Sequence, residues 1–300
     1  MTTISEQWAE LLEPGLRTIF DITRDGLATT SRIPVLFNVT TSSKAQEHDL
    51  GMGGMSDWNE YKGAIEYDSL EQGFKTTYTH VEYSKGFAIE RKLVADDQYN
   101  IINGRPRALA ISAMRSREKD AANIFNNAFS SSYVGGDSVA LCGAHPYSPG
   151  NATTQSNTGT TALSYDAVIA TRKLMRAFAD DRGELVSIMP DTLLVPPELE
   201  NTAWEILESI NKPGTANNDG NYVRSTGTQL IVWDYLTDAN NWFMIDSQLA
   251  KLYLNWFDRE ALKFAMDPTS DFNLVARYRG YMRYSLGWSD WRWVYGHNVA

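Results

Sequence analysis

Cysteine is almost missing from this sequence, because Cys142 is the single example among 300 residues. An intrachain disulfide is therefore excluded, which is typical of a protein that assembles in a reducing compartment. Long apolar runs are missing too: no stretch approaches the roughly 18 apolar residues of a membrane-spanning helix. The N-terminus lacks the basic region and apolar core of a secretory signal. We therefore expect a cytoplasmic chain with no membrane contact.

Histidines are few, and the usual catalytic patterns are absent. The four histidines share no metal-ligand spacing, and the H-E-x-x-H, G-x-S-x-G and G-x-G-x-x-G motifs do not occur. Cys142 and His145 lie three residues apart, where a buried thiol and a turn histidine are favoured over a nucleophile–base pair. The adjacent acids Asp180 and Asp181 read as turn residues. The sequence predicts no catalytic residue, cofactor or metal, and hence no enzyme.

Positive charge is scarce and dispersed. The chain has 27 basic and 37 acidic residues, a net charge of −10, and no basic run or tail. Proteins that follow a phosphate backbone need a concentrated cationic face, so we do not expect sequence-specific nucleic-acid binding. An acidic surface next to nucleic acid would instead keep the two from sticking together.

A long helix over residues 106–129 is the main positive feature. Pro106 suits a first helical turn, and a narrow apolar stripe of mostly small residues follows at helical spacing. At about 1.5 Å per residue the helix would be roughly 36 Å long. Such a helix is expected to lie across a sheet or another subunit. The stripe consists of Ala110, Met114, Ala121, Ile124, Phe125 and Ala128.

A polar hairpin precedes the helix, over residues 62–93, with its turn at Leu70–Gly73. Neither face of its second strand is apolar enough for a core, and a two-stranded ribbon is marginal alone in water. We therefore expect another chain to cover it, and residues 66–76 to serve assembly rather than folding. Glycine-rich residues 51–61 are predicted to form a hinge.

The N-terminal 50 residues combine an amphipathic helix, interrupted near Pro14-Gly15, with an extended strand over 33–43. Two interpretations remain open: the helix packs on its own domain, or the segment is an arm laid across a neighbour.

The second half of the chain alternates helices and strands. Residues 141–162 are loop-like, helices are expected over 164–178 and after Pro197, and short strands over 192–195, 230–233 and 242–245. Long strands close the chain, and one of them carries arginines on one face and apolar residues on the other. Aromatic residues cluster near the C-terminus, which leaves open a carbohydrate-binding or carbohydrate-degrading phage or cell-surface protein as the alternative function.

The order of these parts resembles the tailed-phage major capsid proteins of the HK97-like fold, most closely the Mu-type major head subunits. The motifs that carry the resemblance are Ala144-His145-Pro146, Asp180-Asp181-Arg182-Gly183, Leu193-Leu194-Val195-Pro196-Pro197-Glu198-Leu199-Glu200, Pro213-Gly214-Thr215-Ala216-Asn217-Asn218, Trp233-Asp234-Tyr235-Leu236-Thr237-Asp238 and Gly287-Trp288-Ser289-Asp290-Trp291. The resemblance implies an α+β fold in four parts. These are an N-arm (1–50), an E-loop hairpin with its hinge (51–93), a P-domain (94–185 and 256–300) and an A-domain (186–255).

The resemblance also implies the function: a structural subunit that self-assembles into hexamers and pentamers of an icosahedral shell around packaged double-stranded DNA. Implied partners are further copies, a portal, a separate scaffolding protein, since the short N-terminus leaves no room for a built-in one, and a decoration protein. The DNA would be contacted non-specifically, and assembly would take place in the host cytoplasm. Expected contacts between subunits are Lys62, Glu66, Glu71, Lys75, Tyr78, Arg115, Arg117, Arg277, Arg279 and Arg283.

Overall fold

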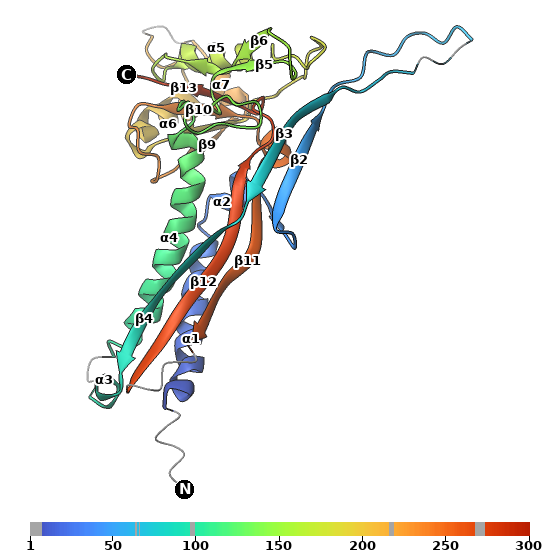
Figure 1. Cartoon of the computed structure of the whole chain (residues 1–300). Coiled ribbons are helices and arrows are strands. Elements are labelled where there is room, and N and C mark those ends of the chain that lie inside the picture. The colour runs from blue at the N-terminus through green and yellow to red at the C-terminus, as the bar shows by residue number, and fades with distance from the viewer. Residues whose placement is uncertain (1–7, 64, 66, 97–99, 216–218, 268–273) are drawn as a thin grey trace.

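The computed structural model describes residues 8–63, 65, 67–96, 100–215, 219–267 and 274–300. The molecule is elongated, as Figure 1 shows. A body made of long strands and two long helices carries a head at one end, and a hairpin projects from the side near the head. Glu66, an expected contact residue, lies outside the described residues.

The long helix α4 (Gly104–Asn126) is the spine of the body. It begins two residues before the expected start and ends three residues before the expected end. Ala110, Ala121 and Ala122 are fully buried, and such small side chains let neighbouring elements approach the helix axis closely. In the part of the chain that the structure describes, no helix is long and apolar enough to cross a membrane.

Helix α1 (Trp8–Ala28) packs beside α4 on the same chain. Leu16 and Phe20 are buried, and the Phe20 ring lies 5.2 Å from Phe264. The expected interruption at Pro14 is wrong, because the proline lies on the exposed side and the helix continues through it. Of the two interpretations of this segment, the structure therefore favours the first, in which the helix packs on its own domain.

The expected strand over 33–43 is only half right. Its first part is a short helix, α2 (Ile33–Leu36), and only β1 (Asn38–Thr41) is extended. Pro34 occupies the first turn of α2, where its missing N–H costs nothing, and both end residues are 3% exposed. Two apolar side chains three residues apart therefore pack into one core as a helical turn.

The body is a four-stranded sheet in the order β1-β11-β12-β4, formed with β11 (Leu254–Met266), β12 (Val275–Trp288) and β4 (Val81–Glu90). β1 runs parallel to β11, and the other pairs are antiparallel. Helices α1 and α4 contact the sheet. The predicted alternation along β12 is confirmed, since Ala276 and Tyr278 are buried whereas Arg277 and Arg279 are exposed.

The hairpin has a different register from the predicted one. Its strands are β2 (Gln46–Met52) and β3 (Gln72–Thr79), joined by the long loop 53–71. The turn expected at 70–73 is therefore wrong, because Gln72 and Gly73 already belong to β3. The base of the hairpin is also covered by its own chain: Thr76, Tyr78 and His80 are buried. A short helix, α3 (Arg91–Ala95), follows β4.

The head is built on a five-stranded sheet in the order β7-β13-β10-β8-β9. The predicted strands 192–195, 230–233 and 242–245 are confirmed within a residue, as β8, β9 and β10. The last two do not pair with each other, because β8 lies between them. The strands are β7 (Thr158–Gly159), β8 (Thr192–Val195), β9 (Gln229–Val232), β10 (Trp242–Ile245) and β13 (Val294–His297).

Helices and a small hairpin surround this sheet. Ser164 is the N-cap of α5, because the Ala167 backbone N–H donates to its side chain at 3.2 Å. The surrounding elements are β5 (Ala144–Pro146), β6 (Thr154–Ser156), α5 (Tyr165–Met175), the 3₁₀ turn η1 (Pro197–Leu199), α6 (Glu200–Glu208), α7 (Tyr222–Ser225) and α8 (Ser247–Tyr253).

Packing divides the chain differently from the predicted domain limits. One core fills the body and extends under the head sheet, and the second lies among the head helices. The prediction placed residues 141–178 and 294–297 with the spine helix. In the structure, β7, α5 and β13 belong to the head, because β13 is hydrogen-bonded to β10.

Candidate assembly surfaces

Cys142 and His145, which were considered as a nucleophile–base pair, are both buried. Cys142 is 3% exposed, and burial raises the pKa of its thiol. His145 Nδ1 lies 2.5 Å from Asp137 Oδ2, and its ring stacks on Trp291. Among the described residues, no group of histidine, cysteine or carboxylate side chains could hold a metal ion. Both residues therefore have packing roles.

The C-terminal aromatic residues form part of the core. Trp288, Trp291 and Trp293 are 6%, 5% and 0% exposed, and Tyr284 and Tyr295 are buried as well. A carbohydrate platform needs ring faces that a sugar can reach. The platform interpretation is therefore wrong at these residues.

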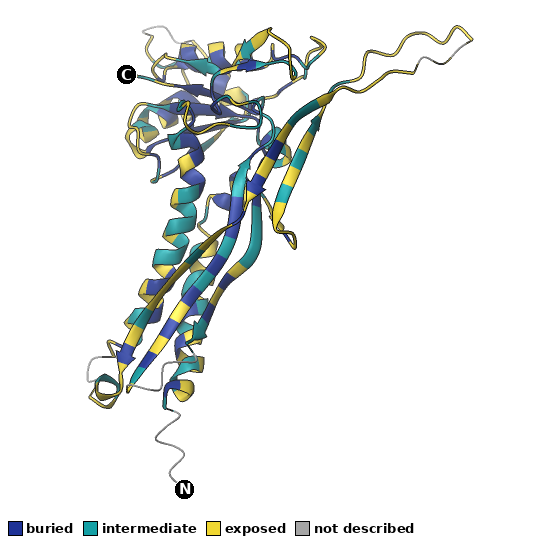
Figure 2. Cartoon of the chain, viewed as in Figure 1, coloured by how far each residue is buried: buried dark blue, intermediate teal, exposed yellow. Residues whose placement is uncertain are grey.

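The loop 53–71 is the most exposed apolar segment. The side chains of Trp58 and Tyr67 are 97% and 91% exposed, and Tyr61 and Ile65 are 72% and 69% exposed. Figure 2 shows the loop reaching away from the body, with most of its described residues coloured as exposed. Exposed apolar groups gathered in one segment mark a site of interaction with another molecule. The sequence analysis placed a hinge over 51–61 and a strand from residue 62 to the turn at 70–73, so it missed this loop, although its aromatic residues were a readable signal.

A turn of the head holds the neck of this loop. The Gly54 backbone N–H donates to Asp181 Oδ1 at 2.7 Å. Arg182 Nη2 donates to Asp68 Oδ1 at 3.0 Å and to the Ser69 carbonyl at 2.8 Å. The N–H of Ser56 and the Arg182 guanidinium both stabilise the Asp68 carboxylate and lower its pKa. We call this set of contacts the neck latch.

Glycine lets the backbone of the neck approach the turn of the head closely. A Cβ atom on Gly53 would collide with the Asp181 carboxylate, and one on Gly54 would collide with that of Asp180. The predicted hinge and the predicted turn residues, more than 120 positions apart, are therefore in contact. The contact could not be predicted from the sequence, because the two segments are so far apart along the chain.

A buried histidine lies where the projecting hairpin branches from the body sheet. His80 is the single residue between β3 and β4, and it is 6% exposed. Its Nε2 lies 3.2 Å from Ser42 Oγ, and its Nδ1 lies 3.0 Å from Ser285 Oγ. Burial, followed by the positive charge of Arg283, lowers the pKa of His80. The branch point is thus built around a neutral imidazole.

Two expected contact residues are instead internal. Tyr78 is 3% exposed, and its hydroxyl donates to Asp49 Oδ2 at 2.9 Å. Arg117 pairs with Asp258 at 2.9 Å and stacks over Trp256 at 4.8 Å. Both side chains therefore already have partners within their own chain, and their role as contact residues stays a prediction.

The remaining expected contacts are accessible to a neighbour. Arg283 lies partly exposed, 3.7 Å from Glu82. The other described ones are exposed on the loop, on β3, on α4 and on β12: Lys62, Glu71, Lys75, Arg115, Arg277 and Arg279.

Comparison with known proteins assigns a family to most of the chain. Residues 73–296 match the family described as phage capsid protein. No curated protein sequence matches the chain.

Solved capsid structures share the fold. A structure of Microbacterium phage Oxtober96 covers 90% of this chain and 91% of its own chain, at a TM-score of 0.56 and 9% identity. The mature capsid of bacteriophage PhiM1 covers 90% and 87%, at a TM-score of 0.56 and 11% identity. The capsid of bacteriophage JBD30 decorated with minor capsid protein trimers covers 69% and 91%, at a TM-score of 0.55 and 13% identity.

Proposed function

This chain belongs to the phage capsid protein family, and from that premise we propose that its projecting loop joins neighbouring copies within hexamers and pentamers. The chain is a major capsid subunit with the HK97-like fold, a component of the virion shell. The observation that carries the proposal is the exposed apolar loop 53–71, held outward by the neck latch. A subunit that must bury this loop needs a neighbour to bury it against.

We propose further that the shell is icosahedral and encloses double-stranded DNA. The net charge of −10 keeps the inner surface from adhering to the DNA, so contact with it is non-specific. The role is structural, without catalysis. Assembly takes place in the host cytoplasm, with a portal and a separate scaffolding protein. A decoration protein is a further proposed partner, since the JBD30 capsid is described as decorated with minor capsid protein trimers.

The family parts are proposed to correspond to segments of this chain. The N-arm is 1–50 up to the start of β2, the E-loop is the hairpin within 51–93 extended back to β2, and the P-domain is the rest of the body. The A-domain is the head, which needs β7, α5 and β13 in addition to residues 186–255. Among phage capsids, we place the chain with the Mu-type head subunits on the motifs between residues 144 and 291.

Electron microscopy of the purified full chain, produced with and without a scaffolding protein, tests the proposal. We expect shells, tubes or ring-shaped capsomers. A strictly monomeric protein at high concentration under both conditions would contradict it. The expected contact residues Lys62, Glu66, Glu71, Lys75, Arg115, Arg277, Arg279 and Arg283 would then be mapped by their protection in shells.

A further inference from the structure

Two arginines of neighbouring strands meet at a bulge in the body sheet. The register of β11 and β12 shifts between Asp258 and Glu260, so that Arg259 and Glu260 both lie opposite Arg283. A β-bulge of this kind sets two residues of one strand against a single residue of its partner and redirects a side chain. The two arginines are therefore direct neighbours across the strands.

Both arginines have a buried donor without an acceptor. The Nε atoms of Arg259 and Arg283 are buried, and among the described residues neither has a hydrogen-bond partner. An N–H group buried without an acceptor is unfavourable, and so are like charges at opposite positions of two strands. An anion between the two guanidinium groups would remove both penalties.

The carboxylates beside the pair do not supply that anion. Glu82 Oε1 lies 3.7 Å from Arg283 Nε, beyond hydrogen-bond distance, and the Glu82 side chain is 61% exposed. Glu260 lies 3.6 Å from Lys263 Nζ instead. Within the part of the chain that the structure describes, Arg259 forms no ion pair.

The histidine of the branch point lies beside the same pair. Ser42 Oγ donates to Glu47 Oε1 at 2.7 Å, so it accepts from His80 Nε2, and His80 Nδ1 accepts from Ser285 Oγ. Burial lowers the pKa of His80, and the positive charges of the two arginines lower it further. Both guanidinium groups therefore lie near the imidazole. Because its hydrogen bonds are made within the chain, the arginines hold the donors that remain.

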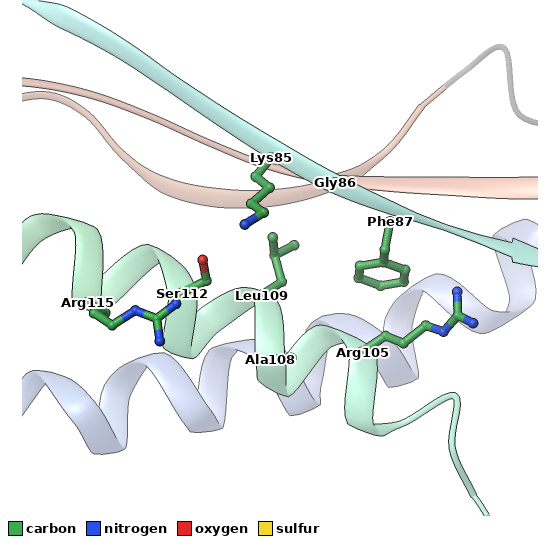
Figure 3. A pocket seen from close by; sticks show the side chains of 8 residues that line it. All are labelled: Lys85, Gly86, Phe87, Arg105, Ala108, Leu109, Ser112 and Arg115. Carbon is green, nitrogen blue, oxygen red and sulfur yellow. The ribbon is translucent and has the colours of Figure 1, made fainter.

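Cations also gather on the other face of the sheet, but they do not require a ligand. Figure 3 shows a groove of about 430 Å³ between β4 and α4, with Lys85 reaching toward the helix that carries Arg105 and Arg115. Lys85 and Arg115 are exposed to water, and Arg105 donates to the Ala88 carbonyl. Among the described residues, no donor of this groove is buried without an acceptor. The bulge differs from the groove in this respect.

We propose that Arg259 and Arg283 bind a small oxyanion of the phosphate class where the hairpin branches from the body. A planar guanidinium group can donate two parallel N–H bonds to such an anion, which a lysine cannot do. The bound anion neutralises the like charges and fastens β11 to β12 beside the root of the hairpin. Because the site lies within one chain, it binds the anion in the free subunit, whether or not shells form.

A phosphate titration of the unassembled full-length chain tests the site by NMR. Isotope-labelled histidine rings give signals for His48, His80, His145 and His297, and the variant His80→Gln assigns the one beside the site. Sodium phosphate replaces sodium chloride at constant pH and ionic strength. We expect a saturable shift of the His80 signal, whereas the signal of His48, exposed on β2, stays in place. No saturable shift, or an equal shift at His48, overturns the site.

Variants of the arginines provide the second measurement. With phosphate at about tenfold its dissociation constant, the thermal midpoint of the parent should rise by about 2 °C. Arg259→Gln should lose this rise, whereas Arg277→Gln, at an exposed arginine on the same face of β12, should keep it. Arg259→Lys retains the charge without the planar fork, so its rise should be intermediate, and it replaces Arg259→Gln if that variant does not fold.

Two outcomes of the variant series contradict the proposal. An undiminished rise in the Arg259 variants would show that phosphate acts elsewhere on the chain. An equal loss in Arg277→Gln would show that the effect depends on the general charge of this face rather than on the bulge.

Discussion

His297 is a neutral imidazole in the middle of the head. Its ring stacks on Trp242 with 4.0 Å between centroids. The Thr161 backbone N–H donates to its Nδ1 at 3.2 Å, and its Nε2 lies 2.8 Å from Thr171 Oγ1. Burial lowers the pKa of His297 to about 4, from 6.5 in a model peptide. Between these two pH values the unfolded chain binds a proton that the folded chain does not.

Stability should therefore be intact above pH 6.5 and fall as the pH is lowered toward 4. The loss due to His297 is expected to be about 2 kcal/mol. In His297→Gln, the fall in unfolding free energy over this range should be smaller by that amount. Urea unfolding of the unassembled subunit at several pH values measures it. His48→Gln, at an exposed histidine, is the control, and parallel curves for His297→Gln and the parent would refute the prediction.

Arg117 and Asp258 join the spine helix to the body sheet. The side chains of both are largely buried, and Trp256 Nε1 donates to the same carboxylate at 3.0 Å. Arg117→Met leaves the Asp258 charge buried without its partner, which should cost about 3 kcal/mol of unfolding free energy. Arg115→Met, at the exposed arginine two residues earlier, should cost less than about 0.5 kcal/mol. Equal denaturation midpoints for the two variants would show that the ion pair does not stabilise the fold.

Residue roles on α4 illustrate what a sequence can indicate at this scale. The charged middle of the helix is readable, but Arg115 and Arg117 look alike there. What separates them is a partner more than 140 positions away, Asp258, together with the ring of Trp256. The burial of Tyr78 could not be predicted for the same reason, since Asp49 and Asn255 enclose it only once β2 and β11 are in place.

Among the elements, the neck latch decides where the projecting loop points. Gly54→Ala places a methyl group against the Asp180 carboxylate and should displace the neck. We expect proteolytic cleavage within residues 53–71 to become about tenfold faster, because the latched form loses stability relative to the open form. Gly26→Ala, where a Cβ atom meets nothing within 4 Å, should cleave like the parent. Unchanged cleavage in Gly54→Ala would mean that the latch does not hold the loop.

The loop itself should be dispensable for folding. The segment first expected to be dispensable, 66–76, includes residues of β3, and Thr76 is buried in the chain. The testable segment is therefore residues 57–65, whose described members, 57–63 and 65, are exposed. Replacing it with glycine and serine at equal length should change the unfolding free energy by less than about 1 kcal/mol and abolish shells. Loss of the cooperative transition would indicate that the loop belongs to the fold.

Elements with strong periodic patterns were predictable, and those that depend on distant partners were not. The spine helix, the strand β8 and the alternation of β12 were predictable from the spacing of apolar residues alone. Each keeps the same pattern of buried and exposed positions along its length. The hairpin register was mispredicted because β2 consists of polar residues with no apolar alternation. Its identity as a strand depends on β3. The prediction interrupted helix α1 near Pro14, because it assumed that this proline breaks the helix. The structure has the helix continuing through Pro14.

At the scale of the molecule, the body is a thin layer with one protected face. Helices α1 and α4 pack on the sheet, and the exposed residues of β12 point to the other side. Among the described residues, no second layer of helices packs along the middle of that other side, so the capsid environment determines what covers it. The sign of the charge on that face should then influence assembly more than folding.

Arg279 gives the sharpest test of that argument. It is exposed on β12, opposite Gly86 of β4 and Ala265 of β11, so neither neighbouring strand offers it a carboxylate in register. A single exposed ion pair contributes only about 0–1 kcal/mol, but every subunit of a closed shell repeats it. At low salt, shell yield should fall from the parent to Arg279→Gln and further to Arg279→Glu, while the thermal midpoints of the free subunits stay together. Salt at about 1 M shortens the screening length to roughly 3 Å and should bring the three yields closer. Yields that are equal at low salt, or that differ by the same factor at both salt concentrations, would show that the charge of this face plays no part in assembly.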